Sequence, residues 1–212
     1  MDKNEAKRNE LYGKTVVAAL EKRAFAAYYC ATKEEALARA LELIPETDVV
    51  SWGGSVSIDE IGLREAVIAR NKVIDRALAK TAEEKTEIMR QALLCDTFLM
   101  SSNAVSEDGL LVNIDGNGNR CAALIYGPKQ IIMIVGMNKV TRDLDSALKR
   151  ARNTAAPINA QKFPNMPTPC AKFGKCMECN MNETICCQFV VTRRCRPANR
   201  IKVILVGENL GY

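Results

Sequence analysis

The chain has 212 residues and a net charge of +5, from 30 basic and 25 acidic side chains. Hydrophobic residues make up 48% of it and charged residues 26%, an ordinary composition for a globular protein long enough to bury a core. The basic residues are spread along the chain, so we expect no basic patch of the kind that a dedicated nucleic-acid binder needs.

The N-terminal stretch MDKNEAKRNELYGK is too polar for a signal peptide, and no apolar run approaches the roughly 18 residues of a membrane span. We therefore expect a cytoplasmic protein with no membrane span. Thiols stay reduced in that compartment, so the nine cysteines indicate metal or redox use more than disulfides. Cys30, Cys95 and Cys121 stand alone among apolar neighbours and are expected in the core.

The chain contains no histidine. This excludes Ser-His-Asp and Cys-His catalysis, so proton transfer must use other side chains. It also leaves thiolates as the ligands for a soft metal ion.

Helical and strand patterns alternate through the first half. In chain order we predict a helix at 3–22, a strand at 25–30, a helix at 32–44, a strand at 48–52, a helix from residue 57, a strand or irregular edge at 71–77, a helix at 81–94 and a strand at 96–102. The last three helices begin at capping boxes, in which two side chains satisfy free backbone N–H groups. These pairs are Thr32 with Glu35, Ser57 with Glu60, and Thr81 with Glu84.

The second half continues in the same way. We predict a hairpin of two short strands at 109–120, strands at 121–127 and 129–136, a helix at 143–152, an ordered loop at 157–183, and closing strands at 185–192 and 200–207. Strands that alternate with helices imply an α/β domain with a largely parallel sheet.

The segment SWGGSVSIDE, residues 51–60, carries the first candidate site. A strand runs into two glycines, two serines and a helix N-terminus, and ligands of parallel sheets bind beyond the carboxyl ends of the strands. Glycines let a ligand approach the backbone, and hydroxyls with free N–H groups suit a phosphate or carboxylate. The segment is neither a Walker A loop nor GxGxxG. A plain strand-to-helix turn explains the local pattern equally well.

Several stretches resemble the LUD (lactate-utilization) family. They are VVSWGGSVSIDEIGL (49–63), GLLVNIDGNGNRCAALIYGPKQIIMIVGMNKV (109–140), DLDSALKRARNTAAPINAQKF (143–163), the TPC…GxCxxC segment and TRRCRPANRIKVILVGENLGY (192–212). The resemblance covers the chain from about residue 8 to its end.

The resemblance implies a NagB/RpiA/CoA-transferase-like fold, a three-layer α/β/α sandwich. We expect one such domain over residues 1–212, with an N-terminal helix and with 164–196 as a Cys-rich segment inside it. The resemblance also implies a link to systems that oxidise L-lactate to pyruvate with iron–sulfur partner subunits. The fold by itself is weak evidence for catalysis.

Three groups within the matching motifs are expected to face one anion pocket. They are Gly53, Gly54, Ser55 and Ser57 after one strand; Gly109, Asn113, Asp115, Asn117 and Asn119 around the hairpin; and Gly136, Asn138 and Lys139 after the strand 129–136. Lys139 could pair with a carboxylate or phosphate. Asp59 or Glu60 could serve as a base, so Asp59 and Lys139 are the catalytic candidates. A turn role for Asp115 and the asparagines is the simpler alternative.

Five of the nine cysteines lie in TPCAKFGKCMECNMNETICCQF, residues 168–189. A C-x2-C step brings two sulfurs onto one tight loop, and four thiolates of such a run hold an iron–sulfur cluster or zinc. The preferred ligands are Cys170, Cys176, Cys179 and Cys186, with Cys187 or Cys195 as alternatives for the fourth. In a strand, adjacent cysteines point to opposite faces, so one of Cys186 and Cys187 should face the core.

We rank an iron–sulfur cluster first, with 4Fe–4S as the expected type. Structural zinc, a thiol/disulfide switch and unliganded cysteines follow, and oxidation would leave the segment without metal. Zinc is less favoured because only one C-x2-C knuckle is present.

Two functions of different classes stay open. The first is an oxidoreductase subunit, a redox component of L-lactate or 2-hydroxy-acid oxidation with a small anionic metabolite as ligand. The second is a non-catalytic ligand- or redox-sensing module on a CoA-transferase-like scaffold. A homo-oligomer is compatible with either.

Overall fold

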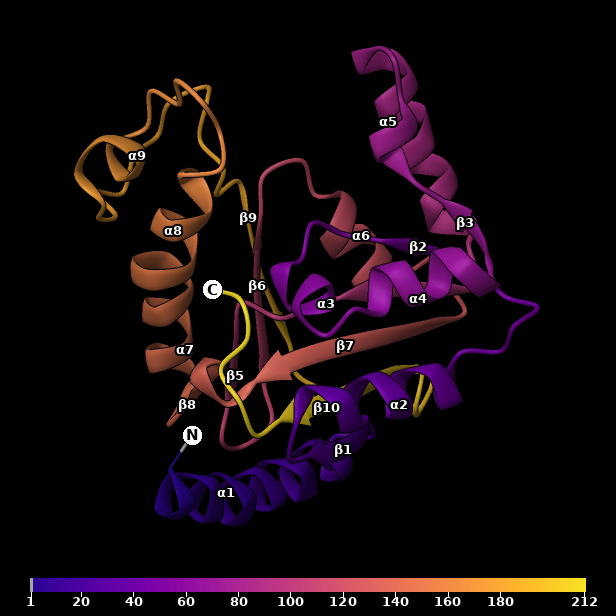
Figure 1. Ribbon diagram of the computed structural model, residues 1–212. Helices are drawn as coiled ribbons and strands as arrows, with labels where there is room; N and C mark the ends of the chain where they lie inside the picture. The colour runs from indigo at the N-terminus through magenta and orange to yellow at the C-terminus, as the bar shows by residue number, and fades with distance from the viewer. Residues whose placement is uncertain (1) are drawn as a thin grey trace.

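The computed structural model describes residues 2–212 (Figure 1). Its central layer is a six-stranded sheet in the spatial order β1-β10-β7-β4-β2-β3, with every neighbouring pair parallel. The strands are β1 (Ala26–Cys30), β2 (Val49–Trp52), β3 (Lys72–Ile74), β4 (Thr97–Met100), β7 (Gln130–Gly136) and β10 (Ile201–Val206). The predicted parallel sheet is thus confirmed.

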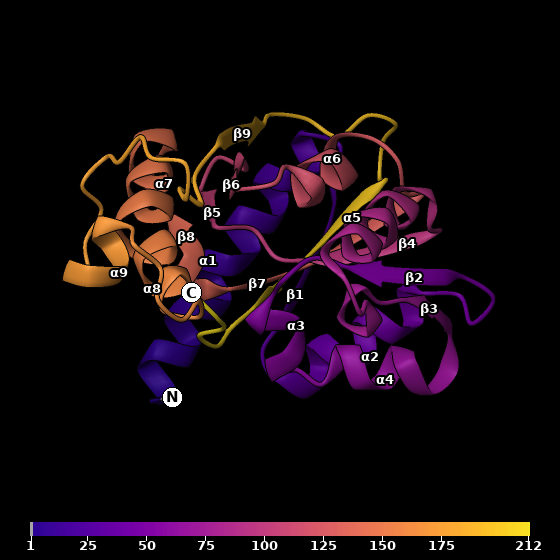
Figure 2. The same ribbon diagram turned by 90° about the horizontal axis from the view of Figure 1, so that it is seen from above.

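Helices cover both faces of this sheet, which makes the predicted three-layer α/β/α sandwich (Figure 2). One face carries α2 (Lys33–Leu43), α3 (Val56–Glu60) and α4 (Leu63–Arg70). The other face carries α1 (Lys3–Lys22) and α6 (Asn119–Ile125), while α5 (Ala82–Gln91) follows β3. None of the helices in residues 2–212 has the length and apolar composition needed to cross a bilayer.

A second sheet of four strands lies on the α1 side, in the order β8-β5-β6-β9. Its strands are β5 (Ala104–Ser106), β6 (Leu111–Asp115), β8 (Val140–Thr141) and β9 (Gln188–Thr192). Its inner face adds Leu111 to the core beneath α1, and its outer face packs against α7 (Leu144–Arg150). A π-helical turn, Ala151–Ala155, joins α7 to α8 (Ala156–Ala160), and α9 (Pro169–Phe173) follows.

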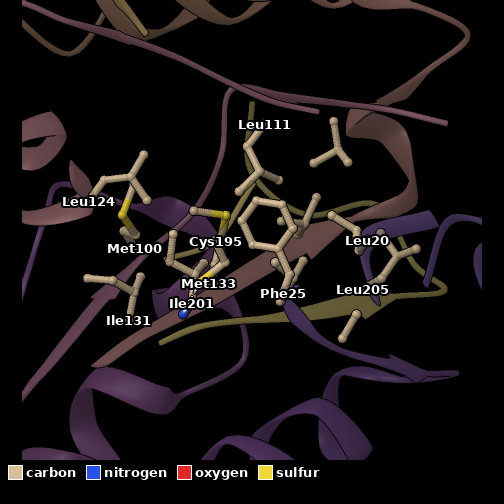
Figure 3. Packing of buried hydrophobic residues seen from close by; sticks show 14 of the residues in the cluster. Leu20, Phe25, Met100, Leu111, Leu124, Ile131, Met133, Cys195, Ile201 and Leu205 are labelled. Carbon is tan, nitrogen blue, oxygen red and sulfur yellow. Dashed lines mark hydrogen bonds between the residues drawn. The ribbon is translucent and has the colours of Figure 1, made fainter. Parts of the chain in front are cut away.

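The core explains the uninterrupted apolar runs of the central strands. In β7, Ile131 and Met133 pack with α1 and α6, whereas Ile132 packs with the helices of the opposite face. A strand buried on both faces needs apolar residues at successive positions. Figure 3 shows the first of these clusters around Phe25, whose side chain is fully buried. Burial of each such side chain stabilises the fold by about 1.5–3 kcal/mol.

The predicted hairpin at 109–120 and strand at 121–127 are wrong. Strand β6 runs straight to Asp115, and α6 then begins at Asn119. Gly118 has a φ of 79°, a left-handed conformation that turns the chain from strand to helix. The Asp115 carboxylate accepts the Cys121 N–H at 2.9 Å and so stabilises the start of the helix.

The second capping box is also wrong. Ser55 is the residue that caps α3, accepting the Ile58 N–H at 3.4 Å, and Ser57 lies inside the helix. The helix stops before Gly62, whose φ is 72°. The Glu60 carboxylate instead accepts the N–H of Gly211 from the C-terminal tail, a contact that sequence spacing does not reveal.

Three other boundaries differ from prediction. The predicted helix at 81–94 ends at Gln91 and continues as a 3-10 turn, and the helix from residue 143 extends through the π turn to Ala160. The closing strand begins at Gln188, so Cys186 and Cys187 precede it and strand alternation does not decide where their side chains point. The segment 157–183 contains α9 and the last turn of α8.

Candidate functional site

A cavity of about 650 Å³ lies at the carboxyl ends of the parallel strands. Ser55 follows β2, Ser101 follows β4 and Lys139 follows β7, and all three line it. We call it the basic cavity because its charged lining is mostly cationic: Arg76, Lys85, Arg120, Lys139 and Lys162 face Asp115 and Glu183. This is the sheet edge at which parallel α/β folds bind ligands.

Lys139 is the buried cation of this cavity, with 3% of its surface exposed. Its Nζ lies 2.8 Å from the Ser57 Oγ and 2.9 Å from the Ser101 Oγ. No carboxylate of residues 2–212 forms an ion pair with it. Burial, reinforced by the positive charge of Arg150, lowers the pKa of Lys139 to about 7. The ammonium and the free amine are therefore both accessible near neutral pH.

The C-terminal tail closes the space behind Lys139. The Leu210 N–H donates to the Asn138 Oδ1 at 3.0 Å, and the Gly211 N–H donates to Glu60 at 2.7 Å. Gly211 has a φ of +54°, and a Cβ there would lie 2.6 Å from the Ser57 Oγ. The tail thus approaches the Ser57–Lys139 pair closely because this position has no side chain.

Arg76 is the cation best placed to meet a ligand. Its guanidinium lies beside Gly54, where a Cβ would come within 3.0 Å of Nη2. Its one side-chain hydrogen-bond partner within residues 2–212 is the Met89 Sδ, at 4.0 Å, and no carboxylate there pairs with it. Burial lowers the pKa of Arg76. Asp115 and Asp75 act on this half-buried cation electrostatically without forming an ion pair, so a bound anion would give it a hydrogen-bonded charged partner.

Arg120 has the opposite character, because its donors are already used. Nη1 donates to the Asn113 Oδ1 at 2.5 Å and to the Ser101 carbonyl at 3.2 Å. Nη2 donates to the Ile114 carbonyl at 2.7 Å, and Nε lies 3.6 Å from the Asp115 Oδ1. Arg120 therefore fixes the floor of the cavity by joining β6 to the end of β4.

The structure brings only some of the predicted pocket residues to the cavity surface. Gly54, Ser55, Asp115, Asn117, Asn119 and Lys139 line it. Ser57 lies behind Lys139, Asn113 lies beneath Arg120, and Asn138 holds the tail.

Gly53, Asp59, Gly109 and Gly136 do not line the cavity. The space beside Gly53 is filled by the Arg120 side chain, since a Cβ on this glycine would lie 2.9 Å from the Arg120 Cδ. Asp59 is exposed and pairs with Arg64 at 2.9 Å.

Among the cavity residues that the sequence did not predict, Ser101, Arg76 and Arg120 matter most for its chemistry. A serine directly after a buried strand was the one available signal for Ser101. The two arginines have no comparable local signal.

Four cysteines line a second, smaller cavity of about 150 Å³. They are Cys170, Cys176, Cys179 and Cys186, and we call this the cysteine cavity. Cys187 is exposed and lies outside it. Cys195 is buried in the main core, where Figure 3 shows it among Met133 and Ile201, and its thiol donates to the Pro197 carbonyl at 3.1 Å.

Cys186 is the thiol of the cysteine cavity whose surroundings disfavour its charged form. Burial raises the pKa of Cys186 to about 11, and the nearby Cys170, Cys176 and Cys179 add to the effect. A bound cation would reverse this shift. Within residues 2–212, no three cysteine or acidic side chains converge closely enough to hold one metal ion. The thiols instead stand around a void.

The two cavities share a wall. Thr184 and Ile185 line both of them. The Thr184 Oγ1 accepts the Cys186 N–H at 3.3 Å and lies 3.7 Å from the Cys179 Sγ. Residues that contact the cysteines therefore also contact the basic cavity.

The three isolated cysteines are in the core, as predicted. Cys30, Cys95 and Cys121 are at most 5% exposed. Burial raises the pKa of each thiol, to about 11 for Cys30 and about 12 for Cys95. Such thiols are poor nucleophiles and need no further role.

Comparison with known proteins relates the chain to one protein family. Residues 13–206 match the model of the LUD domain. A structure of a DUF162 family protein from Deinococcus radiodurans is similar over 93% of this chain and 98% of that one, with a TM-score of 0.54 and 13% identity. This likeness supports the fold described above. No protein of curated function matches the chain.

Two solved structures are similar over part of the chain. Ribose 5 phosphate isomerase A from Neisseria gonorrhoeae has a TM-score of 0.33 and 17% identity, covering 53% of this chain and 54% of its own. The eIF2B delta structure from Chaetomium thermophilum has the same TM-score and identity, covering 56% of this chain and 54% of its own.

Proposed function

Because this chain belongs to the LUD domain family, we propose that it is a redox component of lactate or 2-hydroxy-acid oxidation. The substrate binds in the basic cavity, and the cysteine cavity holds an iron–sulfur cluster. The observation that carries this proposal is the shared wall, because Thr184 and Ile185 line both cavities. A cluster held in one cavity would therefore share two wall residues with a substrate bound in the other.

The cysteine cavity suits a cluster better than a single ion. Its donors are four thiols with no histidine in the chain, the ligand set of 2Fe–2S and 4Fe–4S centres. Ligands of one zinc ion converge on a point, at about 2.3 Å from the metal. The ligands of a cluster stand farther apart, since several iron atoms lie between them. Four thiols around a void of about 150 Å³ favour the second arrangement.

A cluster there would supply reversible one-electron transfer. Cys170, Cys176, Cys179 and Cys186 would hold it as thiolates, and its charge would be offset by Arg152, which also lines the cavity. Arg152 is itself held by Glu178 at 2.8 Å.

The basic cavity supplies the substrate site. Arg76 has no carboxylate partner in residues 2–212 and would bind the substrate carboxylate. Lys139, with a pKa lowered to about 7 by burial, would accept the hydroxyl proton of a 2-hydroxy acid. Oxidation of such an acid to a 2-oxo acid releases two protons and two electrons. Partner iron–sulfur subunits would receive the electrons, as the family resemblance implies.

A sensing role is the second candidate, and one observation favours it. Asn182 to Ile185, which lie between the cysteines, also line the basic cavity. Oxidation or metal loss at the cysteines would therefore alter ligand binding without any turnover. The two candidates differ in whether 2-hydroxy acid is consumed.

The test is anaerobic purification with iron, sulfide and zinc analysis and a visible spectrum. The proposal expects brown protein whose absorption bleaches when L-lactate is added, and pyruvate formation when an artificial electron acceptor is present. Colourless protein with one equivalent of zinc contradicts the cluster. A cluster that L-lactate does not reduce, in protein that still binds it, supports the sensing role instead.

A further inference from the structure

We infer that Ser101 and Lys139 form a nucleophile–base pair for acyl transfer, an activity separate from any redox chemistry of this chain. The Ser101 Oγ lies 2.9 Å from the Lys139 Nζ, and both residues line the basic cavity. A hydroxyl becomes a nucleophile when an adjacent base takes its proton, and serine–lysine pairs serve this purpose on unrelated folds.

A third residue completes the arrangement. The Ser57 Oγ lies 2.8 Å from the same Nζ, and Ser57 is fully buried behind the lysine. Gly211 leaves the space that this contact needs, because a Cβ there would lie 2.6 Å from the Ser57 Oγ. Ser57 therefore lies on the closed side of Lys139, and Ser101 lies on the side of the cavity. The contact with Ser57 orients Lys139 as a base.

The surroundings of Lys139 favour its neutral form. Burial is the largest cause, and together with nearby charges it lowers the pKa of the lysine to about 7. Arg150, Arg120 and Lys162 disfavour the ammonium, while Glu60 favours it. A neutral amine accepts the Ser101 proton while it donates to Ser57.

Ser101 differs from the neighbouring Ser102. The Ser102 hydroxyl is committed to the carbonyls of Ala104 and Val112, at 2.8 and 3.0 Å. Within residues 2–212 the Ser101 hydroxyl has, besides the lysine, a single long contact of 3.3 Å to the Ser102 carbonyl. Ser101 is thus the one of the two whose hydroxyl is free to turn toward a ligand.

The cavity indicates the substrate class, an activated acyl compound that carries a negative charge. Its volume of about 650 Å³ has room for a ligand with a tail, and Arg76 offers a cation with no carboxylate partner in residues 2–212. An ester or thioester whose tail ends in a carboxylate or phosphate meets both features.

The reaction requires only the substrate and water. The Ser101 Oγ forms a bond to the acyl carbon while Lys139 takes the hydroxyl proton. The bond to the leaving group then breaks, its electron pair goes to the leaving group, and Lys139 returns the proton to it. Water attacks the acyl-serine in the same way, which releases the carboxylic acid and restores Ser101.

The test uses the full chain, purified anaerobically, with two chromogenic esters: p-nitrophenyl acetate and the anionic p-nitrophenyl hemisuccinate. We expect Ser101→Ala and Lys139→Met to lower p-nitrophenol release by roughly 100-fold or more, the usual contribution of a nucleophile or base. Ser102→Ala is the matched control and should keep the wild-type rate. The wild-type rate should rise with pH through about 7 as Lys139 loses its proton.

A second readout does not depend on how the variants fold. A fluorophosphonate should label wild-type protein, and peptide mass spectrometry should place the label on Ser101. Preference for the hemisuccinate should disappear in Arg76→Gln. Label on Ser102 or on a cysteine overturns the inference, and so does wild-type hydrolysis by a folded Ser101→Ala variant. Absence of both hydrolysis and labelling overturns it as well. Because none of these readouts needs a metal, they are independent of the iron analysis that tests the redox role.

Discussion

The cysteine cavity takes its four thiols from residues 170–186, whereas the basic cavity gathers side chains from the ends of β2, β4 and β7. The strands beneath the basic cavity are almost completely buried, but of residues 168–189 only Thr168 and Cys170 are. Packing fixes the basic cavity without a ligand, while the more exposed cysteine segment would gain order from the proposed cluster. The proposed function therefore combines one rigid site with one site that its ligand would order.

The largest expected effect concerns the fourth ligand of the proposed cluster. Cys186→Ala should abolish the visible absorption and stoichiometric iron, because Cys186 lines the cysteine cavity. Cys187→Ala is the matched control and should leave both unchanged, since Cys187 is exposed and lies outside. Iron and sulfide per chain, measured under anaerobic conditions, show which of the two variants has lost the cluster. Equal loss in both variants would contradict the assignment.

The second effect tests the rigid site. Arg76→Ala should weaken L-lactate binding roughly tenfold or more, because a hydrogen bond to a charged group contributes about 1.5–3 kcal/mol when desolvated. Arg64→Ala removes an arginine that already pairs with Asp59, outside the cavity, and should change affinity little. Titration calorimetry measures both. If Arg64→Ala weakens binding as much as Arg76→Ala, the ligand lies elsewhere.

Lys139 should make stability depend on pH. The unfolded chain keeps this proton up to its ordinary pKa of 10.5, whereas the folded protein releases it above about 7. The unfolded state thus binds more protons in that window, so the free energy of unfolding rises with pH, by up to about 1.4 kcal/mol per pH unit. Lys139→Met should remove this rise.

Urea unfolding between about pH 7.5 and 8.5 measures the rise cleanly. Above about pH 9 the buried thiols, whose pKa values are raised, change stability in the opposite direction. An equally steep rise in Lys139→Met would show that another group titrates, and Lys129→Met, at an exposed lysine, serves as the control.

The smallest effect compares two adjacent glycines. A Cβ at Gly54 would lie 3.0 Å from the Arg76 Nη2, the mobile end of a side chain, so Gly54→Ala should weaken ligand binding only two- to threefold, on the order of 0.5 kcal/mol. A Cβ at Gly53 would lie 2.9 Å from the Arg120 Cδ, which cannot move freely because its guanidinium is held. Gly53→Ala should therefore lower the melting temperature more than it lowers affinity. The reverse pattern would contradict these roles.

The sequence by itself determined the parallel α/β sheet and the content of the cysteine cavity. Apolar runs such as 131–135 require a strand buried on both faces, and Thr32 and Thr81 cap their helices as the spacing predicts. The four preferred cysteines face one void because they are close in the chain, so short loops suffice to gather them. The spacing of cysteines along the chain is therefore enough to predict which of them lie together.

Only the tertiary structure decided which side chains make the basic cavity. The sequence pattern around Arg120 predicts strands, so it gave no sign of a cavity residue. The role of Arg120 depends on Gly118, where the chain turns from the end of β6 into the start of α6. Lys139 acquires its lowered pKa from burial beneath the C-terminal tail, whose contact with the neighbouring Asn138 spans 72 residues of chain. Contacts of that sequence separation follow from how the layers pack, and packing depends on all the elements together rather than on any one motif.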